Sequence, residues 1–134
     1  MIELSNTTAQ TLATGQAITF DKVLLKTGCA ECHRANTSSV KLCSRGTYVV
    51  SFSGNIGADA ATTAVQLSIQ LGGDTIIGST MESTTAAAGD LNAVAKTVPV
   101  RNCCCDYDRV TIVNTGTTAV TVGANSTLFI RRVS

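Results

Sequence analysis

Residues 47–56, TYVVSFSGNI, carry the strongest fold signal in the chain. Every second side chain from Tyr48 to Ile56 is large and apolar, apart from Gly54, whereas the intervening ones are mostly small and polar. A period of two is that of a β-strand, whose side chains alternate between opposite faces. We therefore predict a strand with one face in the core and the other partly wet or covered by a neighbouring chain.

A second stretch, residues 64–71, repeats the alternation without interruption, with polar side chains between Val65, Leu67, Ile69 and Leu71. The following Gly-Gly-Asp turn and residues 75–78 predict a β-hairpin. The predicted core includes nine side chains from three stretches: Tyr48, Val50, Phe52, Val65, Leu67, Ile69, Leu71, Val110 and Ile112.

Further short apolar segments predict the remaining strands. They lie at 17–25, 94–100, 110–113, 118–122 and 128–133. Proline cannot donate a hydrogen bond to a sheet, so Pro99 indicates that the strand at 94–100 lies at an edge. Thr and Gly interrupt residues 81–92, for which we predict a loop. Turn signals eight to twelve residues apart are typical of an antiparallel sandwich or barrel.

The composition agrees with an all-β protein that has a largely uncharged surface. Thr occurs 21 times among 134 residues, and branched side chains favour strands. Only 14% of the residues are charged, against roughly 25% in ordinary soluble domains. With ten Lys and Arg against nine Asp and Glu, the chain has no net field to attract nucleic acid or anionic lipid. We therefore expect neither nucleic-acid nor membrane partners.

The two ends of the chain suggest a simple domain organisation. Residues 1–16 contain few large apolar side chains and are predicted to form an extended N-terminal arm, followed by one domain at 17–134. The N-terminus has no basic region followed by an apolar one, so we expect synthesis in a cytoplasm without a signal peptide. No apolar run approaches the 18 or more residues of a membrane-spanning helix.

The order of these elements resembles the globular heads of the tumour necrosis factor (TNF) and complement family, over roughly residues 15–134. The stretches that carry the resemblance are GQAITF at 15–20, GTYVVSF at 46–52, the strand at 65–71 with its Gly-Gly turn, IGS at 77–79, and LFIRRV at 128–133. The resemblance implies an antiparallel jelly-roll sandwich that assembles as a homotrimer. Members often place aromatic side chains on the trimer axis, whereas this chain has two Tyr, three Phe and no Trp.

Phage and bacterial exosporium relatives of this family imply a non-enzymatic structural role. We expect a virion or surface-assembly protein, such as a phage capsid decoration or head-fibre protein. Its partners would be further copies of the chain and other virion proteins, such as the major capsid protein reached through residues 1–16. The alternative is a receptor- or carbohydrate-binding head. A single His and the lack of a nucleophile motif argue against an enzyme.

Six cysteines in two stretches form the candidate site. Cys29 and Cys32 have the spacing of a zinc-ligand pair, and Cys103 and Cys105 would point the same way along an extended segment. The four thiolates are a candidate zinc site, with His33 or Cys43 as a substitute ligand. Disulfides between the two stretches, with Cys43 or Cys104 taking part, are the competing hypothesis, and reduced, buried cysteines are a third. Sequence alone does not choose among them.

The stretch from Cys29 to His33 also has the spacing of a covalent haem-attachment motif. We do not expect haem, because attachment requires export. The chain also offers only Met1 and Met81 as distal ligands.

Overall fold

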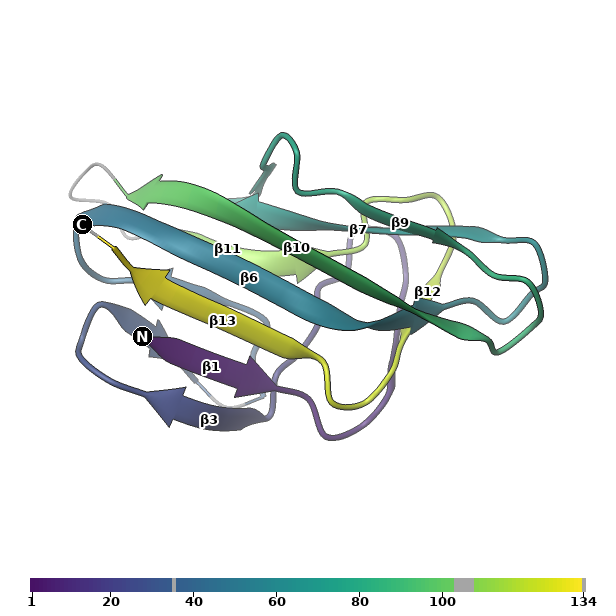
Figure 1. The fold of residues 1–134 in the computed structure, drawn as a ribbon, viewed down its shortest axis with the longest axis horizontal. Helices are drawn as coiled ribbons and strands as arrows, with labels where there is room; N and C mark the ends of the chain where they lie inside the picture. The colour runs from purple at the N-terminus through teal and green to yellow at the C-terminus, as the bar shows by residue number, and fades with distance from the viewer. Residues whose placement is uncertain (35, 103–107, 134) are drawn as a thin grey trace.

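The computed structural model describes residues 1–34, 36–102 and 108–133, and within them it contains strands and no helix (Figure 1). The strands are β1 (Ile2–Ser5), β2 (Gln10–Leu12), β3 (Lys22–Lys26), β4 (Glu31–His33), β5 (Val40–Leu42), β6 (Gly46–Gly57), β7 (Ala64–Leu71), β8 (Asp74–Thr75), β9 (Met81–Thr84), β10 (Leu91–Asn102), β11 (Arg109–Val113), β12 (Val120–Val122) and β13 (Thr127–Arg132). No helix in this part of the chain is long and apolar enough to cross a membrane.

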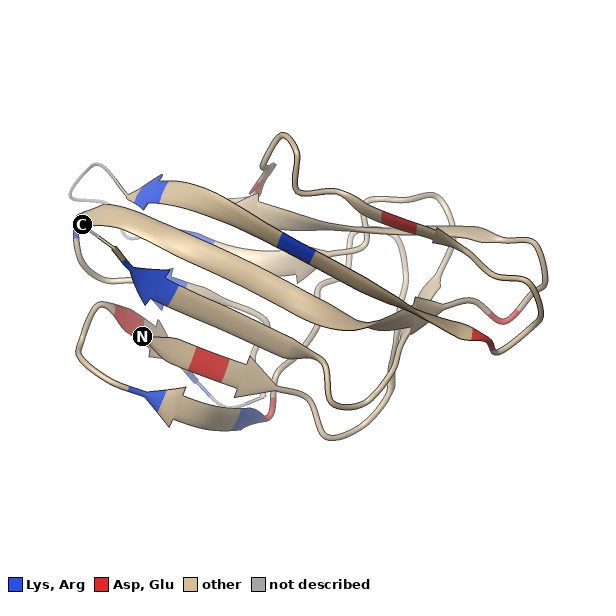
Figure 2. Ribbon diagram, in the orientation of Figure 1, with Lys and Arg blue, Asp and Glu red and all other residues tan. Residues whose placement is uncertain are grey.

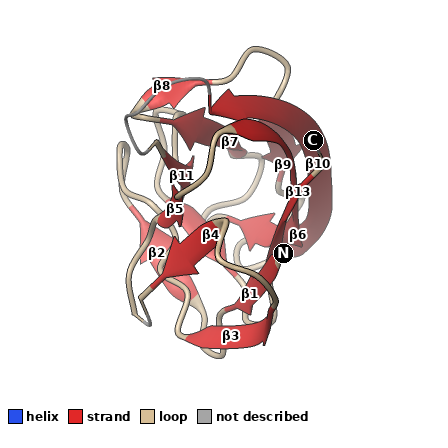
Figure 3. Ribbon diagram, turned by 90° about the vertical axis from the view of Figure 1, so that its left-hand side faces the viewer, coloured by secondary structure: helices blue, strands red, loops and turns tan. Residues whose placement is uncertain are grey.

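The strands form two antiparallel sheets that face each other, as the end-on view shows (Figure 3). The first sheet has the order β2-β12-β6-β13-β1-β3, and β10 pairs with the other edge of β6. The second has the order β4-β5-β11-β7-β8, and β9 pairs with β7. The predicted all-β antiparallel sandwich is confirmed. In Figure 1 the first sheet lies in front, with β10, β6, β13, β1 and β3 side by side.

Strand β6 is the central strand of the first sheet. Along its whole length it pairs with β10, from Gly46 opposite Asn102 to Gly57 opposite Leu91. Its other edge pairs with β13 and then with β12. Because β10 pairs only with β6 among the described strands, the edge position predicted from Pro99 is confirmed.

The core between the sheets contains the side chains that the alternation predicts. Eight of the nine predicted core residues are buried, and Leu71, beside the turn at the end of β7, is half-buried. Tyr48 is fully buried, and its hydroxyl donates to the carbonyl oxygen of Ser44 at 2.6 Å. Burial raises the pKa of Tyr48 above its ordinary value of 10.0, so this hydroxyl stays a hydrogen-bond donor across the physiological range.

The N-terminal segment differs from the predicted arm. Strand β1 lies between β13 and β3, and Ile2, Leu4 and Leu12 are buried in the core. Four large apolar side chains among sixteen residues gave too weak a pattern to reveal these strands, which are held by pairing with partners far away in the sequence. Residues 1–12 are therefore part of the sandwich and do not form a free arm.

The predicted loop at 81–92 is also partly wrong. Met81–Thr84 forms β9, which pairs with β7, and β10 already begins at Leu91. The Thr-rich sequence has no alternation of its own, and pairing with β7 supplies the strand geometry.

A substitution in β1 tests its place in the core. Leu4→Ala should lower the free energy of unfolding by about 2–5 kcal/mol, because it leaves a cavity at a fully buried position. Leu24→Ala, on the edge strand β3 where Leu24 is 54% exposed, is the matched control and should change stability by about 0.5 kcal/mol or less. Urea unfolding measures both, and equal losses would contradict a core role for β1.

Candidate functional site

The outward side of the first sheet forms a surface that we call the neutral face. It consists of the side chains of β6, β10 and β13 that point away from the core. These are Thr47, Val49, Ser51, Ser53 and Asn55 on β6, Ala93, Ala95, Thr97, Pro99 and Arg101 on β10, and Thr127, Phe129 and Arg131 on β13. They belong to three neighbouring strands, because the register places Thr97 opposite Ser51 and Ser51 opposite Phe129.

Charge is nearly absent from this face. Strand β6 contains no charged residue and is drawn without blue or red in Figure 2. Arg101 and Arg131 lie near one end of it, opposite Thr47 and Val49. The side chain of Lys96 lies on the other side of β10, because its register partner is the buried Phe52. The part of this face away from Arg101 and Arg131 can be removed from water without burying an unpaired charge.

The edge of the same sheet exposes apolar side chains. Val23, Leu24 and Leu25 of β3 are 43%, 54% and 44% exposed, between Lys22 and Lys26. Contiguous exposed apolar residues mark interaction surfaces, and lysines at the ends of an edge strand oppose uncontrolled strand pairing. The first sheet therefore offers both a flat neutral face and an apolar edge for contact with another protein.

The second feature is a thiol pair on the other sheet. Strand β4 pairs with β5, with Glu31 opposite Leu42 and Cys32 opposite Lys41. Cys43 follows β5 directly, and its backbone N–H donates to the carbonyl oxygen of Ala30. This register places Cys32 and Cys43 diagonally on one face, with their Sγ atoms 2.9 Å apart.

Only part of the predicted zinc set lies within the described residues. Cys29 is exposed and Cys32 half-buried, whereas Cys103, Cys104 and Cys105 lie outside the described residues. Within the described ranges, no group of three or more His, Cys, Asp or Glu side chains is placed to hold a metal ion. The four-thiolate site therefore stays a prediction.

Asn102 and Asp108, the described residues on either side of segment 103–107, contact the backbone next to Cys43. The Asn102 side-chain amide donates to the carbonyl oxygens of Leu42 and Ser44, at 3.1 and 3.0 Å. The carbonyl oxygen of Asp108 accepts from the backbone N–H of Leu42. The meeting of the two cysteine stretches stays a prediction, because Cys103, Cys104 and Cys105 lie outside the described residues.

His33 is not placed as a metal or haem ligand. Its Nδ1 lies 3.0 Å from the carbonyl oxygen of Ser39 and its Nε2 lies 3.1 Å from that of Phe20. A ligand nitrogen must direct its lone pair at the metal, and here both nitrogens face other acceptors. His33 instead links β4 to the segments around residues 20 and 39.

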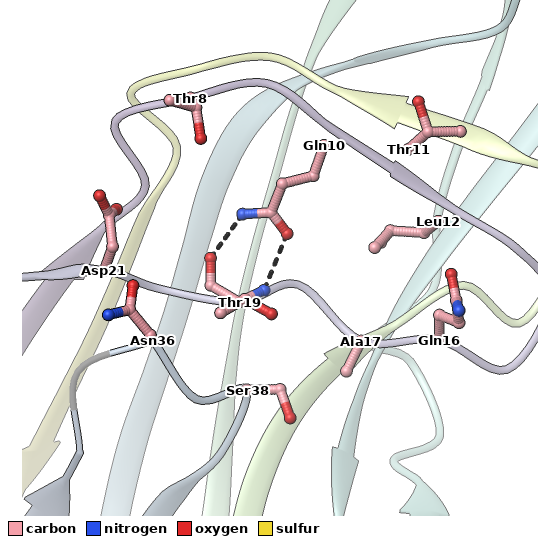
Figure 4. A pocket seen from close by; sticks show the side chains of 10 residues that line it. All are labelled: Thr8, Gln10, Thr11, Leu12, Gln16, Ala17, Thr19, Asp21, Asn36 and Ser38. Atoms are coloured by element: carbon pink, nitrogen blue, oxygen red, sulfur yellow. Dashed lines mark hydrogen bonds between the residues drawn. The ribbon is translucent and has the colours of Figure 1, made fainter.

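The third feature is a polar depression of about 580 Å³ (Figure 4). It lies between β2 and the segments around residues 16–21 and 36–38. The Gln10 side chain crosses between them, because its amide donates to the carbonyl oxygen of Thr19 and accepts from the Thr19 N–H. Thr11, Asn36 and Ser38 add hydroxyl and amide groups to the lining. Asp21 is the one carboxylate among the lining residues.

Sequence reasoning did not single out Gln10, Asp21 or Glu31. The Glu31 side chain is fully buried, and its Oε2 accepts from the amino group of Met1 at 2.8 Å. Asp21 accepts from both the backbone N–H and the hydroxyl of Thr7. Each contact joins residues 9 to 30 positions apart, and no local pattern in the sequence signals such a pairing.

Comparison with solved structures identifies the fold. The globular domain of zebrafish complement 1qA protein superposes with a TM-score of 0.72 at 9% identity, over 99% of this chain and 96% of that one. Eiger TNF from S. frugiperda gives 0.78 at 10% identity, over 99% and 91%. Murine APRIL gives 0.69 at 12% identity, over 98% of each chain. No protein-family model matches the sequence, and no curated relative is found by sequence comparison.

The protein is thus an all-β protein of the jelly-roll class. More particularly, it has the TNF-like jelly-roll fold, as the resemblance in the sequence predicted.

The hydrogen bonds of Asp21 predict a loss of stability in acid. The bonds from the Thr7 hydroxyl and backbone lower the pKa of Asp21 below its ordinary value of 3.8. When the pKa of a carboxylate is lower in the folded state than in the unfolded state, its ionised form stabilises the fold at any pH above the unfolded-state pKa. This stabilisation is lost as the pH falls through the folded-state pKa. We expect the urea midpoint to decline below about pH 4, and to decline less in Asp21→Asn.

The matched control for this prediction is Asp59→Asn, at an exposed position between β6 and β7. It should retain the acid-dependent decline of the unsubstituted protein. An Asp21→Asn variant with an unchanged pH profile would contradict the assignment.

Proposed function

We propose that this protein is a non-enzymatic structural head of a virion or other surface assembly, and that it self-associates as a trimer. The neutral face is the observation that carries the proposal. The resemblance to TNF and complement heads supplies the expected number of subunits. Within virions, a capsid decoration or head-fibre protein is the specific role that we propose, with other virion proteins as partners.

Self-association fits the chemistry of the neutral face better than a charged partner does. A nucleic acid or an acidic protein is recognised through clustered cations, whereas this face carries Arg101 and Arg131 only near one end. Identical copies bring no net charge to each other when the centre of the face is uncharged. The exposed apolar edge at β3 adds area whose burial is favourable.

The placement of β1 and β2 argues against attachment to a larger particle through an N-terminal arm. Residues 1–12 are paired within the sandwich, so they are not available as a free arm that reaches a capsid protein. Attachment to other virion proteins therefore falls to the loops and to the surfaces that the trimer leaves open.

A non-catalytic role is supported by the way the titratable side chains are used. His33 has both ring nitrogens beside carbonyl oxygens, and Asp21 is held by Thr7. The hydrogen bonds described for His33 go to carbonyl oxygens and to no thiol or hydroxyl, whereas activation of a nucleophile would require such a contact.

The polar depression beside Gln10 favours a second candidate, a carbohydrate-binding head. Neutral sugars are bound through hydroxyl groups, which the amides and hydroxyls of this depression can match in both directions. Its lining has no aromatic side chain to stack on a sugar ring, so binding would rest on hydrogen bonds alone.

A charge placed on the neutral face tests self-association. Thr97→Glu introduces a carboxylate at an exposed position of β10 and should convert trimers into monomers, because each subunit would have to bury an unpaired charge. Thr111→Glu, on the outward side of the second sheet, is the matched control and should remain trimeric. Light scattering after size exclusion measures both; a monomeric unsubstituted protein, or a trimeric Thr97→Glu variant, would refute the proposal.

The carbohydrate alternative has its own test. A panel of neutral oligosaccharides is titrated against the protein, with nuclear magnetic resonance shifts as the readout. If the depression binds sugars, Ser38→Arg should abolish the shifts by filling it, whereas Thr117→Arg, on an exposed loop, should not. Shifts that survive Ser38→Arg, or no shift with any oligosaccharide, would remove this candidate.

A further inference from the structure

We propose that Cys32 and Cys43 form a redox pair, in which the Cys32 thiolate first attacks a small anionic disulfide and Cys43 then closes an intrachain disulfide bond. This pairing lies within one of the two cysteine stretches, unlike the disulfides between stretches considered from the sequence. It does not depend on the proposed trimer.

The geometry leaves little movement between the thiols and the bond. The two Sγ atoms are 2.9 Å apart, and a disulfide bond is about 2.05 Å long, so the sulfurs need to approach by less than about 1 Å. The backbone already holds them there, because Cys43 donates to the Ala30 carbonyl oxygen and Cys32 lies opposite Lys41. No strand has to separate for the bond to form.

The surroundings of the two thiols assign them different roles. Cys32 lines a depression of about 480 Å³, together with Arg34, Lys41 and Arg109, and Cys43 is not among the lining residues. The Arg109 guanidinium donates to the Ser39 hydroxyl at 3.3 Å, which holds it at the rim. Cations that line a depression attract an anionic reagent to it. Oxidised glutathione, a disulfide that carries carboxylates, matches the charge of this site.

Cys43 is suited to the second step. Cys43 does not line the depression in which a reagent would meet Cys32, but its Sγ lies 2.9 Å from the Cys32 Sγ. A reagent in the depression therefore meets Cys32 first. Once Cys32 is in a mixed disulfide, Cys43 has a neighbouring sulfur to attack without any need to diffuse.

The reaction balances as two thiol–disulfide exchanges. Cys32 loses its proton, and its thiolate attacks one sulfur of oxidised glutathione; a mixed disulfide forms and one glutathione thiolate leaves and takes up a proton. The Cys43 thiolate then attacks the Cys32 sulfur, and the second glutathione leaves in the same way. The two cysteines give up two electrons, and one glutathione disulfide is reduced to two thiols.

The bond would close a weakly held corner of the sandwich. Strand β4 has three residues and pairs only with β5 among the described strands, and β5 pairs with β11 at two positions. Strand β4 also carries Glu31, which binds the Met1 amino group, and His33, which lies between two carbonyl oxygens. Oxidation would thus fix covalently the strand on which these contacts depend. Such a bond is expected to form when a protein leaves a reducing cell, because disulfides persist in oxidising surroundings.

The experiment uses the full chain, incubated with oxidised glutathione, blocked with an alkylating reagent and digested with trypsin without reductant. We expect peptide 27–34 joined to peptide 42–45. Cys29→Ser is the matched control and should still give this crosslink, because Cys29 is exposed and not part of the pair. Cys43→Ser should accumulate glutathione on Cys32, whereas Cys32→Ser should lose the crosslink.

Two further measurements sharpen the test. Oxidation should raise the thermal midpoint by roughly 5–10 °C, as closure of a loop of about a dozen residues predicts, and reductant should reverse the rise. Arg109→Gln should slow the first step, and added salt should slow the unsubstituted protein but have less effect on this variant.

Three results would overturn the proposal. Free thiols at both Cys32 and Cys43 after oxidation would exclude the pair. A crosslink from either residue to the peptide that contains Cys103, Cys104 and Cys105, in place of the 27–34 to 42–45 link, would assign the disulfide elsewhere. Bound zinc, with both thiols released for reaction only by a chelator, would assign them to the metal site predicted from the sequence.

Discussion

The alternation along β6 is the constraint on which the rest of the structure depends. This strand is hydrogen-bonded at both edges, and every second side chain from Tyr48 to Phe52 is fully buried in the core. A shift of one residue would put Ser51 into the core and Phe52 into water, so the register is fixed by the cost of that exchange. Strands β10, β12 and β13 take their positions from β6, and β1 in turn from β13.

The same alternation creates the surface from which function is argued. While Val50 and Phe52 point inward, Ser51 and Ser53 must point outward, and β10 and β13 place Thr97 and Phe129 beside them. The two 12-residue strands β6 and β10 lie side by side, so the uncharged side chains on their outward side form one continuous surface. Core formation and the neutral face are thus two consequences of one sequence pattern.

Buried polar contacts hold together the parts that this pattern does not reach. The Glu31 carboxylate has no exposed surface, and its pairing with the Met1 amino group joins β4 to the start of β1 across the two sheets. A buried carboxylate without this partner would be costly, so the two segments stabilise each other. The Cys32 and Cys43 sulfurs lie on the same short strand pair, which explains why a bond between them would matter more here than in the middle of a sheet.

Sequence by itself determined the class of fold, the course of the long strands and nearly all of the predicted core, because a period of two records directly which face of a strand is buried. The pairing of the short strands was decided only in three dimensions. Residues such as Ile2, Leu4 and Met81 are buried by strands far away in the chain, and local pattern carries no information about those partners. The thiols illustrate the same limit, since counting cysteines suggested a link between two stretches, whereas the register of β4 and β5 placed Cys32 beside Cys43.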